Sequence, residues 1–143
     1  MPEKARVGVL ISGRGSNMAA LLYASRLYDC PYEIVVVGSN DPDAAGLVLA
    51  AAEGVRTFAH SHLGKKRAEF DAVITRELEQ AGVTHIALAG YMRLLSAEFV
   101  THWQGRCLNI HPSLLPSHKG LHPHEAVLAA GEAETGCTIH IVT

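Results

Sequence analysis

VGVLISGRGSN, residues 7–17, is the stretch from which the fold can be predicted. Its first five residues are an apolar run, which is typical of a strand buried on both faces. Gly13 and Gly15 then allow a tight turn. A helical pattern follows over Ser16–Leu27, with Met18, Leu21 and Leu22 on one face. A strand, a glycine-rich loop and a helix in this order indicate the first unit of an α/β sheet.

The same alternation continues along the chain. Further strands are predicted at residues 34–37, 56–58, 86–89, 106–110 and 137–142. Further helices are predicted at residues 44–52, 66–81, 96–103 and 124–130. We therefore expect one domain over residues 1–143, a Rossmann-like α/β fold whose mostly parallel sheet carries helices on both faces.

Composition narrows the class of protein. The 143 residues are 48% hydrophobic and 18% charged, which fits a globular domain with a sizeable core. A net charge of −2 argues against a nucleic-acid partner. No apolar stretch is long enough to span a membrane. Cys30, Cys107 and Cys137 are odd in number and form no paired motif, so we expect buried, reduced thiols in a cytoplasmic protein.

The segment Asn109-Ile110-His111-Pro112-Ser113-Leu114-Leu115-Pro116 carries the candidate catalytic residues. It follows a short apolar run, at the strand end where ligands bind in open α/β sheets. Asn109 and His111 are two residues apart, so on an extended segment their side chains point the same way. The amide can donate to a developing oxyanion, and the imidazole can move a proton. The alternative is an Asn and a His that satisfy the backbone of a turn.

The loop after the first strand predicts a phosphate site at Gly15, Ser16 and Asn17. A helix N-terminus offers free N–H groups to an anion, and the two polar side chains add donors. A dinucleotide fingerprint would place a glycine where Met18 stands, which favours a single phosphate. Asp41 keeps a ribose-binding alternative open, although it also suits a turn before Pro42. A glycine-rich turn with a serine cap is the plain structural alternative.

Two other segments are candidates for binding a second ligand. Met92, Leu94 and Leu95 follow a strand and would provide an apolar slot, or else belong to the ordinary core. Arg67 begins a helix after two lysines and suits an acidic ligand tail, or else a solvated basic face. His118, His122 and His124 share a loop but lack further ligands at metal-binding spacing, so we expect a polar loop and no metal.

The octapeptide at 109–116, the loop at 12–17 and Leu88-Ala89-Gly90-Tyr91-Met92-Arg93 occur in an order that resembles the formyltetrahydrofolate-dependent formyltransferases. The Gly-Ser-Asn loop is most similar to those that act on glycinamide ribonucleotide. The resemblance implies formyl transfer from 10-formyltetrahydrofolate to the amine of that nucleotide, in de novo purine biosynthesis.

Residue roles are also implied by this resemblance. Asn109 and His111 would be catalytic, and the phosphate of glycinamide ribonucleotide would bind Gly15, Ser16 and Asn17. The folate co-substrate would contact Arg67, Met92, Arg93, Leu94, Leu95 and Asn109. A homodimer is an expectation left open.

The resemblance also implies a further catalytic Asp, in a loop a few residues beyond the strand that ends near Thr143. We therefore expect a missing C-terminal part. Three alternatives remain open: another formyltransferase or a formyltetrahydrofolate hydrolase, a non-catalytic nucleotide-binding domain, and an NAD enzyme, against which Met18 argues.

Overall fold

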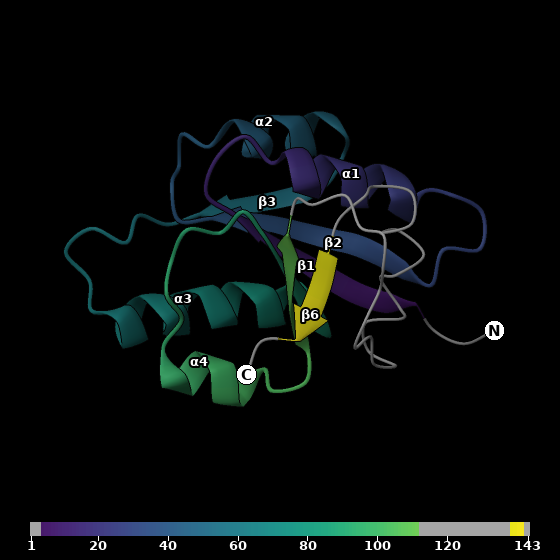
Figure 1. Cartoon of the computed structure of the whole chain (residues 1–143). Helices are drawn as coiled ribbons and strands as arrows, with labels where there is room; N and C mark the ends of the chain where they lie inside the picture. The colour runs from purple at the N-terminus through teal and green to yellow at the C-terminus, as the bar shows by residue number, and fades with distance from the viewer. Residues whose placement is uncertain (1–3, 112–137, 142–143) are drawn as a thin grey trace.

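The computed structural model describes residues 4–111 and 138–141 (Figure 1). The strands are β1 (Ala5–Ile11), β2 (Tyr32–Ser39), β3 (Arg56–Ala59), β4 (His85–Ala89), β5 (Cys107–His111) and β6 (Thr138–Ile141). The helices are α1 (Ser16–Ser25), α2 (Ala45–Ala52), α3 (Arg67–Gln80) and α4 (Ala97–His102).

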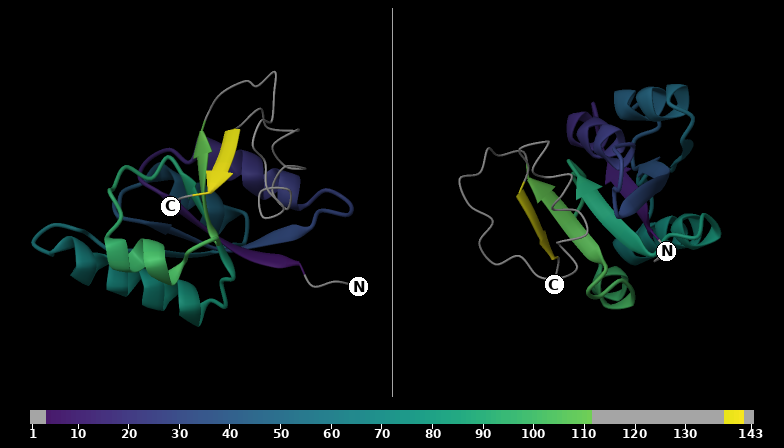
Figure 2. Two further views of the ribbon diagram at one scale, coloured as in Figure 1. Left: turned by 60° about the horizontal axis from the view of Figure 1, so that its bottom comes forward. Right: turned by 90° about the vertical axis from the view of Figure 1, so that its right-hand side faces the viewer.

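These strands form one sheet in the order β3-β2-β1-β4-β5-β6. The first five strands pair in parallel, and β6 pairs antiparallel with β5. Helices α1 and α2 lie on one face of the sheet and α3 and α4 on the other (Figures 1 and 2). The Rossmann-like, mostly parallel α/β fold predicted from the sequence is confirmed.

Each face of the sheet has its own apolar core. Under α1 and α2, the buried side chains include Val9, Ile11, Met18, Leu21 and Leu108. Under α3 and α4, they include Leu10, Phe70, Ile74, Ile86 and Trp103. Because β1 is buried on both faces, its residues read as a continuous apolar run rather than an alternating one.

The strand order indicates where on the sheet a ligand would bind. The chain runs from β1 to β2 on one side, whereas β4 lies against the other side of β1. This reversal is the point at which open α/β sheets bind ligands, outside the carboxyl ends of the strands. Leu10 pairs with Gly38 and Leu88, and Leu88 with Asn109, so the strands end nearly level there.

Several predicted boundaries move by a few residues. Helix α1 ends at Ser25 rather than Leu27, and the Ser25 hydroxyl donates to the Leu22 carbonyl in that last turn. Strand β5 continues to His111 because β6 pairs along it, with His111 opposite Thr138. The helix predicted at 124–130 and Cys137 lie outside the described residues.

Candidate active site

A cavity of about 320 Å³ lies at the strand-order reversal. Its lining comes from two segments that are far apart in the sequence. Residues 12–17 from the loop after β1 form one side, and Ala89, Gly90 and Met92 at the end of β4 form the other. Gly15, Ser16 and Asn17 therefore lie in one cavity with Met92, which joins a predicted phosphate site to a predicted folate residue.

The loop at 12–17 owes its shape to two glycines in close contact. Gly15 has φ 74°, a conformation that favours glycine, and it is the N-cap of α1. A Cβ on Gly46 of α2 would lie 3.1 Å from the Gly15 Cα and 2.5 Å from Ile11 Cδ1. The Gly46 N–H also donates to the Gly13 carbonyl at 3.1 Å. The loop is thus clamped against α2 by backbone contacts.

The start of α1 differs from the serine-capped turn considered as an alternative. The N-cap is Gly15, and Ser16 is the first helical residue. Gly15 has no side chain, so the N-cap residue itself provides no side-chain cap for the N–H groups of this first turn. These N–H groups, together with the Ser16 hydroxyl, are chemically suited to an anion.

A hydrogen-bonded relay connects this loop to two neighbouring segments. The Met92 N–H donates to Ser12 Oγ at 2.7 Å, and the Ser12 hydroxyl donates to Asn40 Oδ1 at 2.6 Å. The Asn40 amide nitrogen lies 3.3 Å from His62 Nδ1 and donates to it when the imidazole proton is on Nε2. Asn40 is 7% exposed, so its amide is held in place. We call Ser12, Asn40, His62 and the Met92 N–H the strand-end relay.

The relay was not predicted from the sequence. Ser12 falls within the glycine-rich loop at 12–17, and neither Asn40 nor His62 is among the candidate residues of the sequence analysis. One feature of the sequence could have indicated the relay: Ser12 and Asn40 come directly after β1 and β2, and the carboxyl ends of parallel strands meet at one edge.

The segment at residues 90–96, which we call the folate loop because it holds residues predicted to contact the folate, is fixed at its far end by α3. The buried carboxylate of Asp71 accepts from the Ser96 N–H at 2.6 Å. The Ser96 hydroxyl in turn accepts from the Phe99 N–H at 3.1 Å, so Ser96 is the N-cap of α4 and the predicted helix at 96–103 begins one residue later, at Ala97. The folate loop is therefore held at Met92 by Ser12 and at Ser96 by Asp71.

Apolar side chains of the folate loop are open to solvent. Met92 is 81% exposed and Leu94 is 73% exposed, whereas Leu95 packs against the core under α3 and α4. Assignment to the ordinary core therefore fails for Met92 and Leu94. Exposed apolar side chains beside a cavity suit a flat heterocycle.

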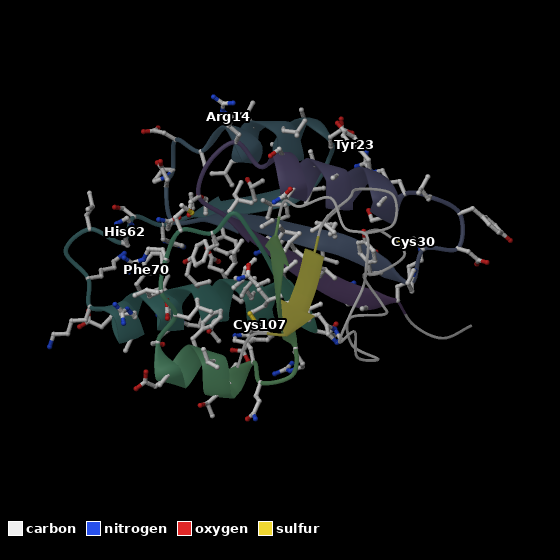
Figure 3. The ribbon with its side chains drawn as sticks, viewed as in Figure 1. Arg14, Tyr23, Cys30, His62, Phe70 and Cys107 are labelled. Carbon is white, nitrogen blue, oxygen red and sulfur yellow. The ribbon has the colours of Figure 1, made fainter. Side chains whose placement is uncertain are left out.

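Arg93 and Tyr91 in the same loop point inward. The Arg93 guanidinium carbon lies 5.3 Å from the Phe70 ring centroid, a cation–π contact. Phe70 also meets the His62 ring edge-on, with centroids 6.2 Å apart (Figure 3). Burial, with a smaller contribution from Asp71, raises the pKa of the Tyr91 hydroxyl well above its usual range. Tyr91 therefore stays neutral.

Asn109 and His111 lie on the strand next to the cavity. Asn109 pairs with Leu88, and Ile110 pairs with the cavity residue Ala89. Asn109 is half-buried, and His111 is the last residue of β5. The structure describes His111 through its backbone. Asn109 and His111 lie on one extended strand, as predicted. That strand ends at His111, whereas the predicted strand ended one residue earlier.

Arg67 is the first residue of α3 and is exposed, as are Lys65 and Lys66. It lies one helical turn from Phe70 and hence near the Arg93 side of the folate loop. Arg67 does not line the cavity. Its assignment to the acidic folate tail stays a prediction.

Asp41 takes part in turn chemistry. Its Oδ1 accepts from the Asp43 N–H at 2.9 Å, and its own N–H donates to Ser39 Oγ. This Asx turn accounts for an acidic residue after β2 without a ribose. Asp41 therefore gives no support to the alternative of a dinucleotide-binding protein.

A second cavity of about 320 Å³ lies between α3 and α4. Its lining includes Asp71, Arg76, Glu79, Ser96 and His102. None of the predicted site residues line it, and it lies along two helices rather than at the strand ends. Since Asp71 there is engaged with Ser96, we take the strand-end cavity as the candidate active site.

Metal-binding residues do not gather in the part of the chain that the structure covers: no group of three or more His, Cys, Asp or Glu is placed to hold an ion there. His118, His122 and His124 lie outside it. Cys30 and Cys107 are buried free thiols, as predicted, and burial raises the pKa of Cys107 to about 12. Among the described residues, no helix is long and apolar enough to cross a membrane.

A mostly parallel sheet with a glycine-rich loop and a cavity at its strand-order reversal defines a Rossmann-like α/β domain, the class in which ligands bind at that edge. The sequence profile described as formyl transferase matches residues 5–143. The chain belongs to this formyl transferase family.

Similar proteins agree with this assignment. A bovine trifunctional purine biosynthetic protein adenosine-3 is 51% identical over 142 residues, which are 99% of this chain and 14% of that protein. The phosphoribosylglycinamide formyltransferase of Escherichia coli K12 is 41% identical over 94% of this chain and 64% of its own length. A crystal structure of the Brucella melitensis phosphoribosylglycinamide formyltransferase superposes with a TM-score of 0.79 at 44% identity, covering 99% of this chain and 74% of that one.

Proposed function

We propose that this chain transfers a formyl group from 10-formyltetrahydrofolate to the amine of glycinamide ribonucleotide. The observation that carries the proposal is one cavity shared by two segments, with Gly15, Ser16 and Asn17 on one side and Ala89, Gly90 and Met92 on the other. A phosphorylated acceptor and a flat, apolar donor would meet there. Relatives that bear the name phosphoribosylglycinamide formyltransferase support this choice of substrates.

The reaction requires the chain to position the two substrates and to stabilise the negative charge that develops on the formyl oxygen. The acceptor amine attacks the formyl carbon, which forms the new C–N bond and a tetrahedral oxyanion. The Asn109 side-chain amide donates to that oxygen, and a protonated His111 stabilises it. The bond to the folate nitrogen then breaks, and the amine proton passes toward that leaving nitrogen with help from His111.

The two sides of the cavity, which we call the phosphate half-site and the folate half-site, would supply the rest of the rate enhancement. Gly15, Ser16 and Asn17 would hold the phosphate. Met92, Arg93, Leu94 and Leu95, largely through their backbone, would hold the folate together with Asn109. Fixing both substrates across one cavity makes the attack effectively unimolecular, which is worth several kcal/mol, up to about 7–11.

The buried thiols of Cys30 and Cys107 are typical of a protein in a reducing compartment, which supports a cytoplasmic location. A homodimer is a separate expectation, which sedimentation of the intact protein would test.

The deciding experiment measures formyl transfer by the intact protein. Purified protein is mixed with 10-formyltetrahydrofolate, with or without glycinamide ribonucleotide, and both N-formylglycinamide ribonucleotide and free formate are quantified. We expect product only when the ribonucleotide is present. Formate release at an equal rate without the acceptor would identify a hydrolase instead. Ribonucleotide binding without turnover would identify a non-catalytic domain.

Changing Ser16 and Asn17 together to Ala should raise the KM for glycinamide ribonucleotide much more than the KM for the folate. Each lost hydrogen bond to a charged phosphate costs about 1.5–3 kcal/mol, or about tenfold to a hundredfold in affinity. Initial rates measured against each substrate in turn give the two KM values. A rise confined to the folate KM would show that this loop was assigned to the wrong ligand.

Arg67→Ala should show the opposite preference, with a higher KM for the folate and little change for the ribonucleotide. Because Arg67 is exposed, the effect should shrink as salt rises from about 0.05 M to about 0.5 M. Arg56→Ala is the matched control, since Arg56 is an exposed arginine at the amino end of β3. A folate defect in Arg67→Ala that ignores salt would point to lost packing rather than a lost ion pair.

A further inference from the structure

The two half-sites are joined by one side chain. Ser12 lies in the loop that would hold the phosphate, and its Oγ accepts from the Met92 N–H of the folate loop at 2.7 Å. Its hydroxyl proton is used at the same time, on Asn40 Oδ1 at 2.6 Å. Both hydrogen-bonding roles are therefore engaged within the protein rather than directed at a substrate.

Asn40 lies in the middle of this connection and is buried. It follows β2, is 7% exposed, and uses its carbonyl oxygen toward Ser12 and its amide nitrogen toward His62. His62 in turn rests edge-on against Phe70 of α3, under the Arg93 guanidinium. The strand-end relay thus spans the ends of β4, β1 and β2 and reaches the helix that starts at Arg67.

We propose that Ser12 and Asn40 are positioning residues that set the spacing between the bound acceptor and the bound folate. Each substrate would keep its own contacts without the relay, because those contacts belong to separate loops. The reaction needs both substrates in register, and displacement of a reacting group by about 1 Å can cost about a hundredfold in rate. Loss of the relay should therefore lower kcat and leave each KM nearly unchanged. This inference rests on the proposed function.

The test compares Ser12→Ala with the unaltered intact protein. We expect kcat to fall about tenfold to a hundredfold, and both KM values to stay within about threefold. Ser12→Thr keeps a hydroxyl and should recover kcat to within about threefold. Ser25→Ala is the matched control, since it removes a hydroxyl that donates to the Leu22 carbonyl at the far end of α1. It should leave kcat unchanged.

Amide hydrogen exchange gives a readout that does not depend on activity. In Ser12→Ala the Met92 amide should exchange at least about tenfold faster, while the Leu88 amide inside β4 should be unaffected. Asn40→Ala should give the same kinetic pattern as Ser12→Ala, since it removes the next member of the relay.

Three results would overturn the inference. The first is a kcat for Ser12→Ala equal to that of Ser25→Ala. The second is a rise in one KM at unchanged kcat, which would make Ser12 an ordinary ligand contact. The third is a slow Ser12→Thr variant whose Met92 amide is still protected. Absence of ribonucleotide formylation by the unaltered protein would refute the proposed function, and Met92 exchange would then decide separately whether Ser12 links the two loops.

Discussion

Replacing His111 by Ala should reduce kcat for formyl transfer by about two to four orders of magnitude. Acid–base groups and groups that stabilise a developing oxyanion are usually worth this much. The affinity for glycinamide ribonucleotide should change little, because the phosphate is assigned to the separate loop at Gly15–Asn17. His111 is the last residue of β5, beside the strand whose end lines the cavity.

The measurement pairs single-turnover rates with calorimetric titration of the ribonucleotide. His102→Ala is the matched control, because His102 is an exposed histidine on α4 whose Nε2 lies 3.2 Å from Glu79 Oε2. We expect that control to retain its rate. If His111→Ala keeps most of its kcat, the imidazole has no part in the chemical step.

Asn109→Asp should lower kcat at least about a hundredfold. The substitution keeps the size of the side chain but removes the amide donor, and loss of one oxyanion donor typically costs 10²- to 10³-fold (~2.7–4 kcal/mol). A carboxylate at this half-buried position would also place negative charge beside the oxyanion.

Asn109→Ala separates these two effects. It removes the donor without adding charge, so a variant that is faster than Asn109→Asp would measure the electrostatic part. Both variants require a thermal melt to confirm folding. Activity near that of the unaltered protein in Asn109→Ala would refute the donor role.

The backbone architecture was predictable because the strands are buried on both faces. Continuous runs such as Val7–Ile11 and Ile86–Ala89 leave few alternatives to a parallel sheet, and the loop at 12–17 marks the first strand-to-helix turn. The parallel sheet then brings residues 12–17 and 89–92 to one edge. The sequence analysis placed both segments after strands, but it did not predict the cavity that they line together.

The contacts inside that edge were not predictable. Asn40 and His62 are polar residues after strands, and the sequence does not say which strand ends become neighbours. That depends on the order β2-β1-β4, in which sequence neighbours and spatial neighbours differ. The role of Asp71 was also missed, because an acidic residue on an amphipathic helix reads as part of its solvated face until Ser96 is seen to donate to it.

The contact between Gly15 and Gly46 has a consequence for drug design. Helix α2 presses backbone against backbone on the loop at 12–17, so that loop is shaped before any ligand arrives. A ligand that matches the shape of this loop would bind without the cost of ordering it, which favours small rigid anions over flexible ones. Compact phosphonates and sulfonates are therefore the first compounds to soak as fragments, and a side chain larger than hydrogen at Gly46 should distort the loop that they would occupy.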